Sequence, residues 1–400
     1  MILHNKNILM GITGSIAAYK ACLVLRHLQE LGADTRVIMT ESAQKFLGKC
    51  TLETLTLHPV YTDLFPDDRS VTTEHVRLAE WADVILVCPA TANSIGKIAS
   101  GIADDLLTTT ILASRASVIF APAMDTHMFE NPIFKANCDR LTHAGYRVLD
   151  TDSGHLASGL TGSGRLLDPL VIVDSVRKAC ASDTNLAGQK ILVSAGPTRE
   201  YLDAVRFISN PSSAKMGIAM AEEAYLRGGE VLLVCGPTSN RVMDGVKIIR
   251  VETAGEMSDC ISSHWQNHDI LVMTAAVSDY RPKTRFQGKI KKEADSFSIE
   301  LTRTTDILAE AAKTKNDRFL IGFALETEPG IKNSLKKLKK KNLDLICLNH
   351  LDSSGDVFGS DRTQITLVEP SGAFEKLPKM TKTETSQKIW DKIETLLRTG

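Results

Sequence analysis

The sequence predicts an α/β protein made of two doubly wound domains, each a mostly parallel sheet with helices on both faces. Short apolar runs of strand length alternate with helical patterns along the whole chain. A small polar stretch at 181–189, ASDTNLAGQ, interrupts this alternation near the middle. We therefore predict domains at 1–180 and 190–400, joined by a linker at 181–189.

Composition narrows the range of functions. The 400 residues are 43% hydrophobic and 24% charged, with a formal net charge of -1, which argues against nucleic acid as the main partner. No apolar run reaches the roughly 18 residues of a membrane helix, and the N-terminus lacks a signal-peptide pattern. The eight cysteines are scattered without a CxxC pair, so we expect a cytoplasmic protein with no structural zinc site.

In the first half, strands are expected at 6–12, 34–40, 83–88 and 117–121, and helix patterns follow them. Ligands of such sheets lie beyond the carboxyl ends of the strands. The groups at those ends are small and polar: Thr13, Gly14, Ser15, Thr40, Thr91, Ala92 and Asn93. Backbone amides and hydroxyls at helix N-termini suit a phosphate and a flat polar ring. They favour a mononucleotide site, and the alternative is that they only cap helices.

Four motifs of this half occur in a fixed order: GITGSIAAYK at 11–20, PATAN at 89–93, APAMDTHM at 121–128 and ASGLTGSGR at 157–165. They resemble the FMN-binding cysteine decarboxylases, the phosphopantothenoylcysteine decarboxylase family. The resemblance implies a flavodoxin-like fold and a trimer with FMN at the subunit interface. It also implies that the substrate thiol is oxidised to a thioaldehyde, which then loses CO2. By the same match, substrate would meet Met124, Met128, Gly164 and Arg165.

The resemblance assigns the decarboxylation step to His75, although a lone histidine before an apolar patch is more often structural. Two further catalytic positions depart from the family. Asp125 stands where an Asn holds the substrate carboxylate, and it offers an acceptor where a donor is needed unless it is protonated. Ser158 lies in a segment where the family has a Cys, and a hydroxyl is a poor acid for the final step. We expect decarboxylation to be slow, altered, or halted at an oxidised enethiol.

In the second half, strands are expected at 191–193, 230–235, 246–251, 269–276, 319–325 and 345–349, with a hairpin at 364–377. This pattern predicts a Rossmann-like sheet with an antiparallel addition. A long polar loop should follow Gly196-Pro197 and lead to a helix capped by Ser212 and Ser213. A strand, a polar loop and a helix N-terminus together make an anion site, and the alternative is an ordinary connection.

Several charged residues of this half sit where they could meet a nucleotide. Asp279 follows a strand and could hold a hydroxyl or a divalent ion. Lys289 lies in a polar loop, and Lys337 and Lys341 share one face of a helix that is basic all round. Each lysine alone is more often a solvated surface charge, but the basic helix fits a triphosphate nearby.

The motifs SAGPTRE at 194–200, RFISNPSSAKMG at 206–217, AAVSDYRP at 275–282, KIKK at 289–292 and GFALET at 322–327 resemble phosphopantothenate–cysteine ligases. That family joins 4'-phosphopantothenate to cysteine with CTP and Mg2+, through an acyl cytidylate. The match implies that Lys289 stabilises charge as the cytidylate forms, that Asn210 binds the acyl intermediate, and that Asp279 holds the cytidine side and the metal. It implies further nucleotide contacts from Ala275, Thr305, Asp306, Ile307, Phe323, Lys337 and Lys341. Ala214 replaces a usual Gly, and its methyl group would hinder a positive φ.

The order of the halves matches the fused bacterial coenzyme A enzymes, so we predict a bifunctional ligase and decarboxylase. The resemblance implies a homo-oligomer, with trimers through the flavin domain and dimers through the ligase domain, and a dodecamer if both contacts form. One alternative is a working ligase fused to a non-catalytic flavoprotein scaffold or regulatory module. Another is an enzyme of a diverged pathway that acts on a different cysteinyl or acyl substrate.

Overall fold

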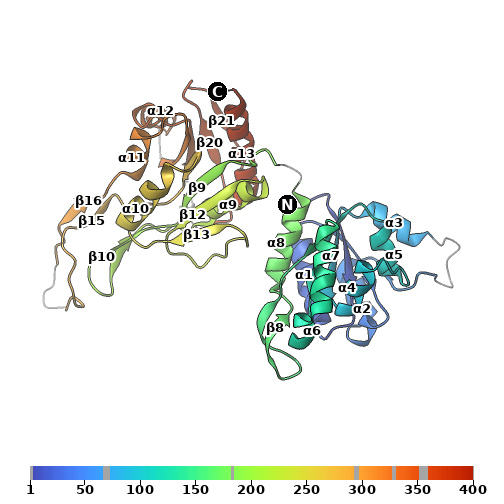
Figure 1. Ribbon diagram of the computed structural model, residues 1–400. Coiled ribbons are helices and arrows are strands. Elements are labelled where there is room, and N and C mark those ends of the chain that lie inside the picture. Colours follow the sequence, from blue (N-terminus) through green and yellow to red (C-terminus); the bar gives the residue numbers. More distant parts are fainter. Residues whose placement is uncertain are drawn as a thin grey trace. The chain divides into compact units, whose positions relative to one another are not determined.

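The computed structural model describes residues 3–65, 73–181, 184–291, 297–326, 330–350 and 359–399, and it divides the chain into two compact units. They comprise Met1–Ser182 and Asp183–Gly400, drawn from blue to green and from green to red in Figure 1. Residues 184–189 belong to the second unit, where Leu186 is buried and Asn185 Nδ2 donates to Glu394 Oε2 over 2.8 Å. No helix in the described ranges is long and apolar enough to cross a membrane.

The first unit is built on a six-stranded parallel sheet with the order β3-β2-β1-β4-β5-β6. Its strands are β1 (Asn7–Ile12), β2 (Asp34–Met39), β3 (Val60–Tyr61), β4 (Val84–Ala90), β5 (Ser117–Pro122) and β6 (Arg147–Val148). Without the short edge strand β3, the order is that of flavodoxin-like folds, and the direction of winding reverses between β1 and β4. The flavodoxin-like prediction is confirmed.

Helices cover both faces of this sheet and enclose two apolar cores (Figure 1). One face carries α1 (Ala18–Glu30), α2 (Lys49–Thr56) and α8 (Pro169–Cys180). The other carries α3 (Glu74–Trp81), α4 (Ala92–Ala99), α5 (Leu106–Ala113), α6 (Thr126–Glu130) and α7 (Pro132–His143). Every residue of β4 is buried, as expected for a central strand covered on both faces. A hairpin of β7 (Asp152–His155) and β8 (Thr161–Arg165) follows, and we call residues 152–165 the clamp.

The second unit has an eight-stranded sheet with the order β13-β12-β9-β14-β17-β18-β20-β21. Its strands are β9 (Lys190–Ala195), β12 (Glu230–Cys235), β13 (Lys247–Arg250), β14 (Ile270–Met273), β17 (Phe319–Glu326), β18 (Leu345–His350), β20 (Ile365–Val368) and β21 (Phe374–Lys376). The first six are parallel and wound in the Rossmann order, whereas β20 and β21 are antiparallel. The predicted Rossmann-like sheet with an antiparallel addition is confirmed.

Five longer helices pack on this sheet. On one face α10 (Ala254–Trp265), α11 (Ile307–Lys313) and α12 (Gly330–Lys340) share a core with the strands. The other helices, α9 (Lys215–Leu226) and α13 (Lys382–Thr399), pack together, and the indole N–H of Trp390 donates to Met220 O over 2.9 Å. The short strands β19 (Arg362–Thr363) and β22 (Met380–Thr381) pair beside α13.

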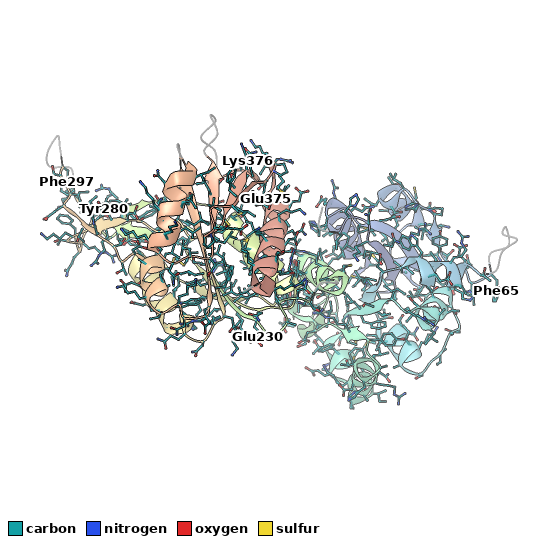
Figure 2. All side chains as sticks on the ribbon, turned by 90° about the horizontal axis from the view of Figure 1, so that it is seen from above. Phe65, Glu230, Tyr280, Phe297, Glu375 and Lys376 are labelled. Carbon is teal, nitrogen blue, oxygen red and sulfur yellow. The ribbon has the colours of Figure 1, made fainter. Side chains whose placement is uncertain are left out.

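Two small hairpins form a projection that we call the arm, residues 199–209 and 280–303. The first joins β10 (Arg199–Tyr201) to β11 (Phe207–Ser209), and the second joins β15 (Tyr280–Pro282) to β16 (Leu301–Arg303). The prediction of a long polar loop is therefore wrong at 199–209, because three-residue strands are too short for a periodic pattern. Figure 2 shows Phe297 at the outer end of this projection and Tyr280 nearer to the sheet.

Candidate functional sites

A cavity of about 880 Å³ lies at the carboxyl ends of β1, β2, β4 and β5, and we call it the flavin cavity. The structure brings to it all the site residues expected in the first half except Thr13 and His75. These are Gly14, Ser15, Thr40, Thr91, Ala92, Asn93, Met124, Asp125, Met128, Ser158, Gly164 and Arg165. The sequence reading missed Lys97 in the wall of the cavity, where Asp104 and Asp105 hold its ammonium group.

Buried hydrogen bonds fix the loops at the end of this cavity nearest the sheet. Thr13 is 1% exposed, and its hydroxyl donates to Pro89 O over 2.7 Å while accepting from Thr91 N over 3.0 Å. Gly14 is packed so closely that an added Cβ would lie 2.4 Å from Ser42 Cβ. The loops after β1, β2 and β4 are thus held together in a narrow cradle. Small groups and backbone amides line it, as binding of a phosphate requires.

The clamp is attached to the start of α6. Thr126 Oγ1 donates to Ser163 O over 2.8 Å, and Met124 N donates to Gly164 O over 2.9 Å. Gly164 has a φ of +113°, and a Cβ there would lie 2.5 Å from Met124 O, so only glycine fits this close approach. The clamp thereby places Ser158 and Arg165 in the wall of the flavin cavity.

The two departures from the decarboxylase motifs face each other. Ser158 Oγ donates to Asp125 Oδ2 over 2.6 Å, and His127 N donates to Asp125 Oδ1 over 3.1 Å. The hydroxyl of Ser158, followed by the amide of His127, lowers the pKa of Asp125 below its ordinary value. Asp125 is therefore a carboxylate near neutral pH, with both oxygens already accepting hydrogen bonds.

His75 lies outside the flavin cavity of a single chain. It occupies the first turn of α3, and the residues that line the cavity do not include it. Its Nδ1 atom is buried and has no hydrogen-bond partner among the described residues. A buried ring nitrogen without a partner is unusual in a stable core.

In the second unit, two adjoining cavities of about 410 and 490 Å³ open at the carboxyl ends of β9, β14 and β17, and we call them together the nucleotide cavity. They share Ala275, Val277, Asp279, Leu308, Phe323 and Lys341. Of the residues expected from the sequence, the cavity contains Asn210, Ala275, Asp279, Thr305, Asp306, Ile307, Phe323, Lys337 and Lys341. Lys289 does not line it. Lys215 and Lys382 do, and the sequence reading missed both.

The amide of Asn210 has a fixed orientation. Its Nδ2 donates to Ala276 O over 3.0 Å and to Val277 O over 3.3 Å, just beyond the end of β14. With both amide hydrogens engaged, Oδ1 remains as the acceptor. Asn210 can thus accept a hydrogen bond from a donor group on a molecule in the nucleotide cavity.

An ion pair sits at the N-terminus of α11. Lys341 Nζ lies 2.7 Å from Asp306 Oδ2, and Asp306 also caps the helix by accepting from Ala309 N over 3.0 Å. Burial raises the pKa of Asp306, but the bonds from Lys341 and the Ala309 amide outweigh it and lower that pKa overall. Asp306 thereby fixes the position of Lys341 at the edge of the cavity.

The loop before α9 departs from the expected capping. Ala214, rather than Ser212 or Ser213, occupies the N-cap position, with no capping bond from its side chain. Its φ of 65° and ψ of -8° place it in the left-handed region, and it is only 4% exposed. Ala214 thus adopts the positive φ that its methyl group was expected to hinder. The next residue, Lys215, is held by Asp361 at 2.5 Å.

Lys289 lies on the arm, on a segment that Asp203 holds in place. Asp203 is 0% exposed and accepts from Val205 N at 2.7 Å, Arg206 N at 2.6 Å and Ile290 N at 3.1 Å. Lys289 itself is exposed. Asp203 therefore connects the β10–β11 turn to the residue that follows Lys289.

The structure offers few groups for a metal ion. Among the described residues, no three His, Cys, Asp or Glu side chains come together as a metal site. Asp279 lines both parts of the nucleotide cavity as a single carboxylate. A divalent ion there would need further oxygen ligands from a bound molecule.

Comparisons with known proteins cover both units. A family model described as "Flavoprotein" matches residues 2–181, and one described as "DNA/pantothenate metabolism flavoprotein C-terminal domain" matches residues 186–397. The coenzyme A biosynthesis bifunctional protein CoaBC of Bacillus subtilis (strain 168) is 43% identical over 398 residues, 99% of this chain and 98% of its own length.

Two further relatives are of interest. A cysteine/cysteine sulfinic acid decarboxylase from an unknown prokaryotic organism is 42% identical over 353 residues, 87% of this chain and 98% of its own. A crystal structure of the C-terminal domain of a CoaBC protein is 38% identical and covers 55% of this chain and 100% of that one, with a TM-score of 0.48.

Proposed function

The chain belongs to the family of bifunctional coenzyme A biosynthesis proteins, and from that membership we propose that its flavin cavity and its nucleotide cavity are the decarboxylase and ligase sites. Membership confirms the two resemblances drawn from the sequence motifs. The chain is accordingly a bifunctional ligase and decarboxylase of coenzyme A synthesis, and its first unit is a flavoprotein domain. The observation that supports our assignment of the sites is that each cavity gathers almost all the residues expected for one activity.

FMN is the flavin that we assign to the first unit. The cradle around Gly14, with backbone amides and the hydroxyls of Ser15, Thr40 and Thr91, fits a phosphate and leaves no room for a side chain at that glycine. The chemistry that FMN supplies when bound is oxidation of the substrate thiol to a thioaldehyde, which loses CO2. Met124 and Met128 would pack against the substrate, and Arg165 would pair with an anionic group of it.

A trimer would explain the position of His75. In one chain His75 lies away from the flavin cavity, with Nδ1 buried and unpartnered in the described structure. The exposed apolar residues Ile16, just before α1, and Tyr19, in its first turn, line the cavity, and Leu23 of α1 is also exposed. We propose that a second copy covers these residues and contributes its His75 to the site. Analytical ultracentrifugation tests the trimer, and a mixture of His75→Asn and Asp125→Asn chains tests the shared site by complementation.

We propose that the decarboxylase half releases an oxidised enethiol. With Ser158 in place of a thiol and bonded to Asp125, the clamp lacks the thiol that would give a proton to the enethiolate. The two electrons removed from the substrate then need an external acceptor, for which we name dioxygen, reduced to hydrogen peroxide. The product keeps its carbon–carbon double bond.

Mass spectrometry of turnover products tests this proposal. The full chain given phosphopantothenoylcysteine in air should form CO2, peroxide and an enethiol that lacks two hydrogens of 4'-phosphopantetheine. The double variant Ser158→Cys with Asp125→Asn should form 4'-phosphopantetheine without peroxide. Clean 4'-phosphopantetheine from the unaltered chain would contradict the proposal. A yellow protein without any CO2 release would instead support the non-catalytic flavoprotein scaffold.

For the ligase half, we propose CTP and Mg2+ as the nucleotide and the metal. Phe323 would pack against the base, Lys337 and Lys341 would meet the polar edge or phosphates, and Asp279 would hold the ribose side or the ion together with phosphate oxygens. Ala275, Thr305 and Ile307 would complete the nucleotide wall. Isothermal titration with CTP, ATP, GTP and UTP in Mg2+ tests the preference.

Asn210 is the residue that we assign to the acyl cytidylate. Its anchored amide would hold the intermediate while the cysteine amine displaces CMP. Asn210→Asp should leave cytidylate formation intact and slow its consumption by cysteine, which rapid-quench analysis with labelled CTP measures. Normal peptide product at the normal rate would remove Asn210 from this role.

A dimer through the arm would bring Lys289 to a nucleotide cavity. The arm exposes several large apolar side chains: Val205, Phe207, Phe286, Leu301, and Tyr280 and Phe297, the two that Figure 2 labels. We propose that they pack against a second copy, whose cavity then receives Lys289 as the cation that stabilises charge during cytidylate formation. Trimers and dimers together would give a dodecamer.

The domain boundaries belong to the same proposal. We assign residues 1–180 to the decarboxylase and residues 190–400 to the ligase, with 181–189 as their join. The substrates are then 4'-phosphopantothenate, cysteine and CTP. All eight cysteines are free thiols, which supports a reducing compartment, the cytoplasm.

A second candidate substrate of the first unit is free cysteine. The relative named as a cysteine/cysteine sulfinic acid decarboxylase supports it, and so does Asp125, whose carboxylate can accept from an α-ammonium group. Stopped-flow reduction of the bound flavin by free cysteine and by phosphopantothenoylcysteine separates the two substrates. Faster reduction by free cysteine in the unaltered chain, but not in Asp125→Asn, would favour this candidate.

A further inference from the structure

A third cavity in the second unit, of about 390 Å³, adjoins the nucleotide cavity. It lies at the base of the arm, beside the N-terminus of α10. We call it the basic cavity because four basic side chains line it: Arg281, Lys283, Arg285 and Arg303. A chain with a net charge of -1 thus concentrates cations around one hollow.

These cations are poorly neutralised by the protein. Lys283 pairs with Glu300 at 2.7 Å, and the guanidinium of Arg285 lies over the ring of Tyr201 at 4.9 Å. Arg281 and Arg303, on the paired strands β15 and β16, have no ion pair within the described structure. Mutual repulsion of such groups disfavours the empty site and favours an anion in it.

The rest of the wall is also suited to an anion. Thr253, Thr304 and Thr305 contribute hydroxyls, and Gly255 belongs to the first turn of the twelve-residue helix α10. The single acidic residue, Glu200, is 4% exposed and accepts from Ala254 N over 2.8 Å, so its charge is engaged with the helix. Four basic residues against one carboxylate leave the cavity positive.

We propose that the basic cavity binds a phosphoryl anion with at least two negative charges. Guanidinium groups match the oxygens of phosphate in pairs, and the hydroxyls supply further donors. An apolar ligand has little to contact here, because Pro282 and the Tyr201 ring are the only large apolar surfaces that the described residues give the wall.

Two sources of that phosphoryl group are at hand, since Arg303, Thr304 and Thr305 also line the nucleotide cavity. One is pyrophosphate released there, and the other is the phosphate of 4'-phosphopantothenate. Pyrophosphate as the source depends on the proposed use of CTP. Binding of an anion to the basic cavity does not depend on it, so the binding can be tested without turnover.

Isothermal titration of the full chain, without CTP or Mg2+, tests the proposal with pyrophosphate, inorganic phosphate and 4'-phosphopantothenate. Pyrophosphate or 4'-phosphopantothenate should bind, with affinity that falls as salt rises. The double variant Arg281→Gln with Arg303→Gln should weaken that binding by about tenfold or more, since it removes two charge-assisted contacts. The double variant Arg281→Lys with Arg303→Lys keeps the charge, and its affinity should lie between those of the unaltered chain and the Gln variant.

Two other variants complete the design. Lys313→Gln alters an exposed lysine of the same unit, paired with Glu310, and should bind like the unaltered chain. Lys341→Gln alters the nucleotide cavity and reports any of these anions that binds there instead. Loss in Lys341→Gln with retention in the double arginine variant would overturn the proposal, and so would absence of binding by all three anions. If the double arginine variant loses affinity for only one of pyrophosphate and 4'-phosphopantothenate, that anion is the source of the phosphoryl group.

Discussion

Ala214 has a backbone conformation that residues with a Cβ atom rarely adopt. It is buried, and it adopts a φ of 65° at the start of α9, where an L-residue with a Cβ is strained. Glycine adopts this conformation freely, although it also loses more entropy on folding. We predict that Ala214→Gly raises the free energy of unfolding of the second unit by about 0.5–1 kcal/mol.

Urea unfolding followed by circular dichroism measures this change. The matched control is Ala219→Gly, in the interior of the same helix, where glycine should cost about 1 kcal/mol. Equal destabilisation by the two substitutions would mean that the left-handed position carries no strain.

Asp125 and Ser158 form a second pair that can be examined at this scale. The Ser158 hydroxyl is the largest cause of the lowered pKa of Asp125, so Ser158→Ala should return that pKa toward the ordinary value of an aspartate. With the lowered pKa, stabilisation by the charged carboxylate is complete above the ordinary aspartate pKa. It is lost as the pH falls through the lowered value.

Carbon-13 NMR of labelled aspartate carboxyls follows this titration, with Asp125→Asn to assign the resonance. Ser153→Ala changes another hydroxyl of the clamp that does not contact Asp125, and it should leave the curve in place. An Asp125 curve that does not move in Ser158→Ala would show that the hydrogen bond is absent in solution.

At the scale of elements, the arm depends on Asp203. This buried carboxylate accepts from the amides of Val205, Arg206 and Ile290, and these bonds lower its pKa, led by the Arg206 amide. Asp203→Asn should free the segment that carries Lys289. We predict a ligase kcat lowered about tenfold or more, because a misplaced catalytic group loses most of its effect, with an unchanged Kd for the nucleotide.

Steady-state kinetics and titration with CTP separate these two quantities. Because the pKa of Asp203 is lowered, its bonds are fully present above the ordinary aspartate pKa and weaken as the pH falls through the lowered one. The control is Asp244→Asn, the same substitution at a residue outside the arm, and it should retain the kcat. A raised Kd for the nucleotide in Asp203→Asn would place the effect in the nucleotide cavity instead.

At the scale of the whole molecule, the two sheets were predictable because their central strands are buried on both faces. Such strands read as continuous apolar runs, as in β4, where every residue is buried. Their polar ends then located both cavities. The clamp and the β10–β11 hairpin were not predictable in this way, because glycine, serine and isolated apolar residues produce no strand periodicity.

Site residues divide along the same line. Those that follow a strand, such as Thr91 and Asp279, line the expected cavity. His75 and Lys289, which motif matching alone assigned, lie outside the cavities of a single chain. Lys215 was missed although it stands in a recognised motif, because a lysine at the start of a helix is an ordinary surface residue. The basic cavity was missed because Arg281, Lys283 and Arg285 look like ordinary surface charges, and only the pairing of β15 with β16 brings Arg303 beside them.

Two compact units with separate cores should unfold as two transitions, and each should respond to its own perturbation. In the second unit, buried Arg227 joins α9 to α13 through Glu223 at 2.9 Å and Glu394 at 2.7 Å. Arg227→Ala removes the guanidinium that both of these buried carboxylates share, which costs about 3–5 kcal/mol.

Calorimetry of the full chain should therefore show a lower transition temperature for the second unit in Arg227→Ala and an unchanged one for the first unit. Lys388→Ala removes an exposed lysine that pairs with Asp391 on the same helix, and it should cost less than about 1 kcal/mol. Added FMN should stabilise the first unit, raising its free energy of unfolding by about 2.7 kcal/mol at a hundredfold excess over the Kd. If Arg227→Ala lowers both transitions together, the two units are coupled in folding, because independent cores cannot transmit the loss of one buried ion pair.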